Sequence, residues 1–512
     1  MVPLRGDEPL STRPLPRGVR RALQAMGADL GRRWCLADLA DIAGVSPRTL
    51  QRQFIACLGK PPQAVLRELG FERARGELLH GDPDLKVMDV ALRCGFAHYG
   101  RFAVAYRRRY GETPSQTLKR QTVLAAQLAA RPAVVMPAQD RPTLAFTPIE
   151  AGAEHDDLAT SISEDLTAAL TRSGLAVVSR AGAARYRMHA VLRHDAADMR
   201  LVLRLVDQTT GRVLWAQRID GVLQHDAEGY ERMAMRVAAA LQPQLRLAEI
   251  ERAARTPEAE LTAHDLALRA LPGVLSLDAE GNARGLDLLH RALDVETEHG
   301  LATALAAWGH AQRVIYHFSS NAAADRAQGL ALARQVGAQW ADPTVLCVLG
   351  SALTLLHEVA DADQVIRRAL AIDGGSAWAW SRSGWLDVYR GDSASAIERF
   401  LIALDLAPQD QLAFNSMVGI GCAHFAAGHY DEAARWHRRG LLEHPSALWV
   451  HRTMCPAYML AGQRTEAGHS MQALRAHYPE LTISEVEGGM PPLPHSYRSL
   501  VVEALSEAGL PA

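Results

Sequence analysis

A short polar stretch in the N-terminal part of the chain carries side chains that can read the edges of nucleic-acid bases. It follows a Gly-Val-Ser-Pro turn, and the four-residue spacing of Leu50 and Phe54 places apolar side chains on one helical face and polar ones on the other. Arginine can donate two hydrogen bonds to guanine, and glutamine can pair with adenine, in a major groove. The candidate base contacts in this stretch are Arg48, Thr49, Gln51 and Arg52.

The residues around this stretch predict a helix, a tight turn and a second helix. Gly44 suits a turn that needs a positive φ, Ser46 is a good helix N-cap, and Pro47 is favoured at a first helical position. The apolar face of the preceding helix is expected to consist of Leu36, Leu39, Ala40 and Ala43.

A second segment, from Val87 to Gly111, repeats this organisation. Val90 and Ala91 line one helical face with Val87, and Gly95 supplies the turn. The second helix is expected to be anchored by Phe102 and Tyr106, with His98, Tyr99 and Arg101 facing outward. Phosphate contacts hold a protein in register without reading sequence, and the residues suited to them are Arg107, Arg108 and Arg109.

Either segment alone is equally compatible with a solvated helical bundle that exposes arginine. Two such segments, about 50 residues apart and joined by a longer helical pattern at Pro62–Leu79, make that alternative much less favoured.

Residues 19–121 resemble the DNA-binding domain of the AraC/XylS-type transcriptional regulators. The motif residues that carry the resemblance are Gly95-Phe96, Phe102, Tyr106, Tyr110-Gly111 and Pro114, with support from Ala-Gly-Val-Ser-Pro at 43–47 and Glu-Arg-Ala-Arg at 72–75. The resemblance implies two helix-turn-helix motifs joined by a linker helix. By position, it carries base contact over to Arg48, Gln51, Arg52 and Arg101.

The chain departs from this family at three places. Gly70 stands where the linker helix usually carries Arg, and Val104 stands where some members place a polar residue that faces DNA. After Pro114 the chain reads Ser-Gln-Thr-Leu-Lys in place of the usual x-x-Tyr-Arg ending. These departures bear on base preference and leave the expected fold unchanged.

Charge divides along the chain in a way that agrees with a polyanion-binding N-terminal region. The 55 Lys and Arg and 57 Asp and Glu of the whole chain give a formal net charge of −2. Residues 1–120 hold 21 basic and 12 acidic residues, a net charge of +9, and the other 392 hold 34 and 45, a net charge of −11. A basic head on an acidic body is the asymmetry expected of a chain that binds nucleic acid at one end.

A different periodicity follows the Ala/Gln/Pro-rich residues 122–142, which we interpret as a linker. Residues 143–250 contain five short strand-type runs, with helical patterns at Asp157–Thr171 and Tyr230–Ile250, and Thr209-Thr210-Gly211 predicts a hairpin turn. We expect a small α/β domain there. Its motifs at 144–148, 162–166, 175–180 and 207–215 resemble a TolB-like domain, with docking and plain structural spacing as equally open roles.

Residues 262–480 predict a solenoid of tetratricopeptide-type helical hairpins, with a helical cap or tail at 481–512. Gly350 and Gly384 are 34 residues apart, as are Pro445 and Pro479. One copy places tetratricopeptide residues at Trp380, Gly384, Ala396, Phe400, Ala403 and Pro408. We expect about five or six repeats, with a protein or peptide partner on the concave face and a small-molecule effector as an open alternative.

The tryptophans of the repeats favour packing over ligand binding. We expect core wedges at Trp378, Trp380, Trp385 and Trp436. Six cysteines without a CxxC pair predict buried, reduced thiols in a cytoplasmic protein, and no metal site or cofactor is expected. The first 18 residues lack the apolar core of a signal peptide, and no apolar run is long enough to cross a membrane.

The sequence therefore predicts a multidomain bacterial protein: an all-α tandem helix-turn-helix head, a small α/β middle domain and an α-solenoid body. The function that fits best is a sequence-specific regulator that binds double-stranded promoter DNA and whose repeats sense a partner or effector. The alternative is a protein-interaction scaffold with a vestigial head. No nucleophile–base pair, metal-ligand spacing or phosphate-binding loop favours an enzyme.

Overall fold

The computed structural model of the 512-residue chain separates into two units, Met1–Pro132 and Ala133–Ala512. Residues 1–15 lie outside the described residues, as does most of the predicted linker at 122–142. The expectation about a signal peptide in the first 18 residues therefore falls mostly outside them. The structure describes residues 16–29, 31–32, 34–58, 60–79, 85–96, 98–110, 112–119, 136–137, 140–178, 184–195, 198–222, 227–337 and 340–512.

Every regular element that the structure describes in the first unit is a helix. Residues 114–119 add a last helical stretch. The named helices are α1 (Arg17–Ala28), α2 (Leu36–Ala43), α3 (Pro47–Leu58), α4 (Pro62–Leu79), α5 (Val87–Arg93) and α6 (Tyr99–Tyr110).

Helix α4 joins two small hydrophobic cores, one for each helix-turn-helix. Its N-terminal half packs Val65, Leu66 and Leu69 against the core of α1 to α3. Its C-terminal half contributes Phe71 and Leu78 to the core of α5 and α6. Because one continuous helix belongs to both cores, it couples the positions of the two motifs.

Gly70 lies where α4 approaches the second motif most closely. A Cβ atom at this position would lie 2.6 Å from the Cys94 carbonyl oxygen and 3.2 Å from the Phe96 ring. The glycine that departs from the family pattern is therefore required by this close approach of α4 to the turn after α5.

We predict that Gly70→Ala destabilises the second motif by about 1–3 kcal/mol, because the added methyl group meets backbone that cannot move freely. Hydrogen exchange of the α4 to α6 amides in the full chain measures the effect. Gly100→Ala is the matched control, since a Cβ built there meets no described atom within 4 Å beyond its chain neighbours and its own helix backbone. Equal protection in the two variants would contradict the steric explanation.

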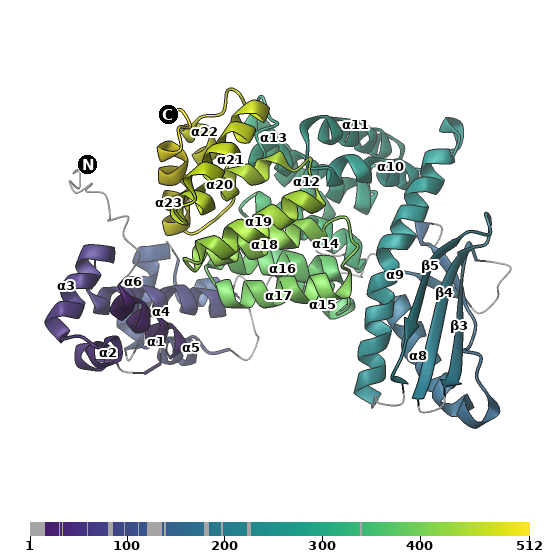
Figure 1. Cartoon of the computed structure of the whole chain (residues 1–512), viewed down its shortest axis with the longest axis horizontal. Helices are drawn as coiled ribbons and strands as arrows, with labels where there is room; N and C mark the ends of the chain where they lie inside the picture. Colours follow the sequence, from purple (N-terminus) through teal and green to yellow (C-terminus); the bar gives the residue numbers. More distant parts are fainter. Residues whose placement is uncertain are drawn as a thin grey trace. The chain divides into compact units, whose positions relative to one another are not determined.

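The second unit begins with a five-stranded mixed sheet. Its strand order is β2-β1-β3-β4-β5, with β1 parallel to β2 and β3 and the last three strands antiparallel. Two helices, α8 (Asp156–Arg172) and α9 (Ala227–Arg255), lie side by side against the sheet (Figure 1). The strands are β1 (Thr143–Phe146), β2 (Ala176–Val178), β3 (Tyr186–Asp195), β4 (Asp198–Asp207) and β5 (Val213–Ile219).

The predicted hairpin turn after β4 is confirmed. Gly211 has a φ of 70°, and its N–H donates to the Asp207 carbonyl oxygen at 2.8 Å. Alternate side chains of β3 and β4 face α8 and α9, as the period of two in the sequence requires. The buried set includes Tyr186, Met188, Leu192, Leu201, Leu203 and Leu205.

Helix α9 runs beyond the predicted end at Ile250 and connects the sheet to the repeats. Arg246 pairs with Asp410 at 2.9 Å, and Arg252 pairs with Asp265 at 2.6 Å. On the sheet side, buried Glu249 accepts hydrogen bonds from Tyr186 at 2.7 Å and from Arg185. Most of these partners lie far away in the sequence, so the local pattern of α9 could not show how it packs near its end.

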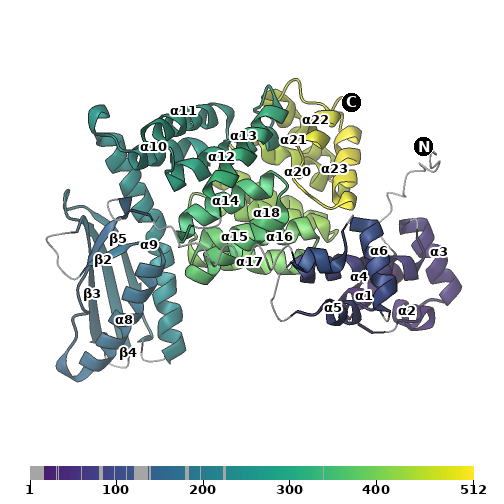
Figure 2. The ribbon, with the colours of Figure 1, turned by 180° about the vertical axis from the view of Figure 1, so that it is seen from behind.

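The repeat body consists of paired antiparallel helices followed by a C-terminal segment (Figure 2). The C-terminal segment contains α22 (Ile483–Gly488) and α23 (His495–Glu507). The pairs are α10 (Ala263–Leu275) with α11 (Ala279–Val295), α12 (Gly300–Ile315) with α13 (Ala322–Val336), α14 (Pro343–Leu355) with α15 (Val359–Ile372), α16 (Ala377–Arg390) with α17 (Ser393–Leu406), α18 (Ala413–Ala426) with α19 (Tyr430–Glu443), and α20 (His451–Leu460) with α21 (Arg464–His477).

Phe400 shows how the repeat residues pack. Its ring is fully buried, and Cβ atoms built at Gly384 and Gly419 would lie 2.9 and 2.2 Å from it. Glycine in α16 and in α18 therefore makes room for one aromatic ring of α17. The predicted steric role of these small and aromatic residues is confirmed.

Two expectations about buried side chains are partly wrong. Cys35 is exposed, and its Sγ accepts a hydrogen bond from the Asp38 N–H as the N-cap of α2. Trp380 and Trp436 are only half-buried, whereas Trp378 and Trp385 are buried as expected. A residue's average burial preference does not settle its place in one particular helix.

His437 is a fully buried imidazole in α19, and neither ring nitrogen has a hydrogen-bond partner in the part of the chain that the structure describes. Burial lowers its pKa to about 3. Between that value and the unfolded value of about 6.5, only the unfolded chain holds a proton on this ring, so stability falls as the pH falls.

We predict that His437→Leu reduces the pH dependence of the free energy of unfolding by about 1.4 kcal/mol per pH unit in this range. Urea unfolding at two pH values measures the slope. The exposed His429→Leu is the control. A slope that changes equally in both variants would count against the assignment to His437.

Candidate nucleic-acid interface

The turn of the first motif is built as the sequence predicts. Gly44 adopts the left-handed conformation with a φ of 69°. Ser46 Oγ accepts a hydrogen bond from the Thr49 N–H at 3.2 Å, and the two hydroxyl groups lie 2.8 Å apart. Thr49 is half-buried and takes part in the cap of α3 (Pro47–Leu58), so it has less freedom to contact a ligand than its neighbours.

Helix α3 presents the other predicted residues on one open face. Leu50 and Phe54 are fully buried on the opposite side. Arg48, Gln51 and Arg52 are exposed. The structure therefore places these three side chains together on the second helix of the motif, where a helix-turn-helix contacts bases.

The second motif is held by a row of aromatic rings. Phe96 lies 4.5 Å from Phe71 and 4.7 Å from Phe102, measured between ring centroids. Tyr106 continues the row at 5.5 Å from Phe102, and its buried hydroxyl lies 3.2 Å from Thr117 Oγ1. These contacts explain why the motif needs aromatic residues at this spacing, because they fix α6 against α4.

The exposed side of α6 carries the predicted contacts of the second motif. His98, Tyr99 and Arg101 are all exposed at or near the start of the helix. The Tyr99 hydroxyl lies 3.3 Å from Ser115 Oγ. Arg101 lies on the same helical face as Arg108, seven residues further along.

Ion pairs separate the arginines of the head into two groups. Arg93 and Arg73 pair with Glu77 at 2.6 and 3.1 Å. Arg109 lies 3.8 Å from Glu68 and stacks over the Tyr110 ring. The arginines that make no ion pair with any described residue include Arg48, Arg52, Arg101, Arg107 and Arg108. Arg109 is therefore less available to a phosphate than Arg107 and Arg108.

Two exposed apolar residues lie beside these arginines. Ile55 is 49% exposed on α3, and Val104 is 72% exposed on α6. Each follows an exposed arginine by three residues along its helix, Arg52 in one case and Arg101 in the other. Apolar side chains contact the methyl group of thymine in a major groove. Sequence reasoning missed Ile55, although its place three residues after Arg52 was a readable signal.

One group of potential metal ligands occurs in the described part of the second unit. Single ligand atoms of Asp140, His264 and His299 all lie within 4.8 Å of one another. His299 Nδ1 accepts the Ala302 N–H at 3.2 Å and so caps α12. Burial lowers the pKa of His264 to about 4, and burial with the nearby Glu296 raises that of Asp140 to about 6. No motif in the sequence indicated this group of potential ligands, because its members are far apart in the sequence.

Comparison with known proteins places the first unit in a defined class. A family described as "Helix-turn-helix domain" matches residues 39–120. The "Probable thc operon regulatory protein" of Rhodococcus erythropolis is 38% identical over 106 residues, which cover 20% of this chain and 32% of that protein. The solved structure of a probable AraC family transcriptional regulator from Rhodopseudomonas palustris is 32% identical over 20% of this chain and 96% of that chain, with a TM-score of 0.20.

Residues 39–120 are thus a helix-turn-helix domain of the AraC/XylS type, a DNA-binding module of transcriptional regulators. The second unit carries a tetratricopeptide-type solenoid behind a small mixed sheet. The chain spans about a third of the length of the first curated relatives that it matches through its head.

A further relative matches a longer part of the chain. The "Putative adenylate cyclase 3" of Rhizobium meliloti is 27% identical over 201 residues, which cover 35% of this chain and 34% of that protein. This match is longer than the first unit, so it must include residues of the second. The TolB-like resemblance of the middle domain stays a prediction.

The ion-pair pattern predicts different roles for neighbouring arginines of α6. If Arg107 contacts a phosphate, Arg107→Ala should weaken binding to duplex DNA of any sequence and reduce the slope of log K against log salt by about 1. Arg109→Ala should change the slope less, because Glu68 and Tyr110 already engage that guanidinium. Fluorescence anisotropy over a range of salt concentrations measures both slopes, and identical slopes would contradict this assignment.

Proposed function

We propose that this chain is a sequence-specific transcriptional regulator that binds double-stranded promoter DNA through its N-terminal unit. The observation that carries the proposal is the pair of helix-turn-helix motifs whose second helices, α3 and α6, expose arginines that make no ion pair with the described residues. Two motifs coupled by α4 can contact two successive major-groove segments within one chain.

The exposed residues are assigned different tasks. Arg48, Gln51, Arg52 and Arg101 select bases, with His98 and Tyr99 at the start of α6 and Thr49 beside the cap of α3. Arg107 and Arg108 contact phosphates and hold the register. Ile55 and Val104 add apolar contacts, which favour thymine at the neighbouring positions.

The repeat body is proposed to receive the signal that the regulator responds to. No helix among the described residues combines the length and the apolar character that a membrane crossing needs. A role on promoter DNA supports a cytoplasmic location and a non-enzymatic function, and the catalytic activity that the Rhizobium meliloti protein's name implies is not carried over to this chain.

The proposal predicts that the full chain enriches a defined sequence from a random pool of DNA duplexes. At that site, Arg52→Ala and Arg101→Ala should each cost about 1–3 kcal/mol and relax selectivity at one position. A gel-shift titration against the selected site and single-base variants of it measures affinity and selectivity.

Arg93→Ala is the matched control, because Arg93 is an exposed arginine of the same domain that Glu77 neutralises. Its affinity should stay within about twofold of the original chain. Failure to enrich any sequence, together with no salt-dependent binding of duplex DNA, would favour the scaffold with a vestigial head instead.

A further inference from the structure

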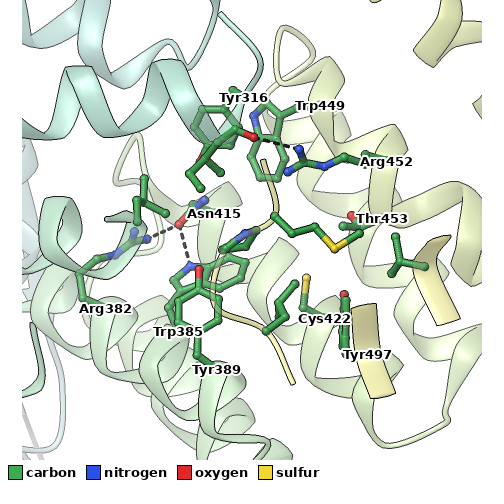
Figure 3. A pocket seen from close by; sticks show the side chains of 16 residues that line it. Tyr316, Arg382, Trp385, Tyr389, Asn415, Cys422, Trp449, Arg452, Thr453 and Tyr497 are labelled. Carbon is green, nitrogen blue, oxygen red and sulfur yellow. Dashed lines mark hydrogen bonds between the residues drawn. The ribbon is translucent and has the colours of Figure 1, made fainter. Parts of the chain in front are cut away.

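A cavity lies inside the repeat body, between its inner helices and the C-terminal segment. About 50 Å³ of it is open to the centres of water-sized molecules, which is more than a single water molecule needs. Its wall comes from the first helices of successive pairs, α12 to α20, and from the segment that follows α22. Figure 3 shows the aromatic and charged side chains that point into it.

The C-terminal segment covers the face on which we expected a peptide partner. Met490, Pro491 and Leu493 line the cavity, and the Tyr497 ring of α23 packs 4.7 Å from that of Phe425 in α18. Met490 and Tyr497 are each 3% exposed. An extended peptide would have to displace these residues to reach the inner helices.

Two arginines reach this cavity from different helices. Arg382 of α16 is 7% exposed and Arg452 of α20 is 6% exposed. Neither guanidinium has a carboxylate within 4.0 Å among the residues that the structure describes. A guanidinium stays protonated in proteins, so each one is a buried positive charge without a negative partner.

The contacts that these arginines do make are to neutral groups. Arg382 donates to Asn415 Oδ1, which also accepts from Trp385 Nε1 at 2.8 Å. Arg452 donates to the Ile315 carbonyl oxygen at 2.9 Å and lies 2.7 Å from His317 Nε2. Burial and the nearby Arg452 lower the pKa of His317 to about 3, so this imidazole is neutral at physiological pH.

The cavity wall has hydrogen-bond donors left over. Arg382 Nε and Trp449 Nε1 are buried and have no hydrogen-bond partner among the described residues. Both can only donate. Unpaired buried donors and uncompensated positive charge are costly, and an anion supplies acceptors and negative charge at once. The remaining wall is apolar and aromatic, from residues such as Tyr316, Trp385 and Val501.

We propose that this cavity binds a small organic acid, with its acidic group attracted by the charges of both Arg382 and Arg452 and its apolar part against the aromatic rings. The shared chemistry is a carboxylate or phosphate on an apolar body. The role of this binding rests on the proposed function. Binding of the organic acid under the C-terminal segment is the signal that the repeat body relays to the DNA-binding unit.

The test is calorimetric titration of the full chain with phenylacetate and phenyl phosphate. Phenylacetamide, which is similar in shape but neutral, and inorganic phosphate, which lacks the apolar part, are the comparisons. We expect the two aromatic anions to bind with a Kd below about 1 mM and at least about tenfold more tightly than the two comparisons. Whichever of the two aromatic anions binds more tightly shows whether the cavity prefers a carboxylate or a phosphate.

Variants locate the site. Arg382→Met and Arg452→Met should each weaken anion binding at least about tenfold, because each removes one charge from the cavity. Both should fold, because methionine keeps much of the side-chain volume and removes a buried charge that has no carboxylate partner. Arg438→Met, at an exposed position of α19, is the matched control and should bind as the original chain does.

Equal binding of phenylacetate and phenylacetamide, or no binding of either aromatic anion, would overturn the proposal without use of any variant. An equal loss of anion binding in Arg438→Met and in the two cavity variants would also overturn the proposal, because binding would then depend on surface charge. Gel shifts with and without the anion separate the two proposals. If the chain binds the anion but no DNA, the proposed regulatory function is wrong. If it binds DNA but no anion, only the proposed cavity site is wrong.

Discussion

Close approach between helices in this protein depends on positions that have no Cβ atom. In the head, Gly70 lets α4 reach the Cys94 carbonyl oxygen and the Phe96 ring. In the body, Gly384 and Gly419 leave the space that the Phe400 ring fills. These contacts set the orientation of α6 against α4 and of α16 against α18. The exposed arginines of α6 and the cavity residues of α16 and α18 are placed by the same steric requirement.

Charge pairing then decides which cations are available to a ligand. In the head, Glu68 and Glu77 engage arginines that hold the helices together, whereas the arginines of α3 and of the open face of α6 make no ion pair with a described residue. In the body, several buried charges are paired, as with Asp363 and Arg390 at 3.0 Å. Arg382 and Arg452 stand out because they are buried in an acidic body without a carboxylate beside them.

Several features were predictable because they depend on residues that are close in sequence. The pattern at Pro62–Leu79 coincides with α4, and Leu50 with Phe54 forms the buried side of α3. The turns at Gly44 and Gly211 both have the positive φ that their residue types favour. Helical period, turn chemistry and capping act over a few residues, so one stretch of sequence contains all the information they need.

The sequence by itself determined the two helix-turn-helix motifs, the strands of the middle domain and the helical repeats, together with which face of each recognition helix is open. Only the tertiary structure decided that α9 continues to Arg255, that Cys35 is an exposed cap, and that Trp385 lines a cavity. It also decided that Arg382 and Arg452, 70 residues apart in sequence, share one cavity closed by the C-terminal segment. The physical reason is that burial and charge pairing depend on which distant helices meet, and no local spacing records that.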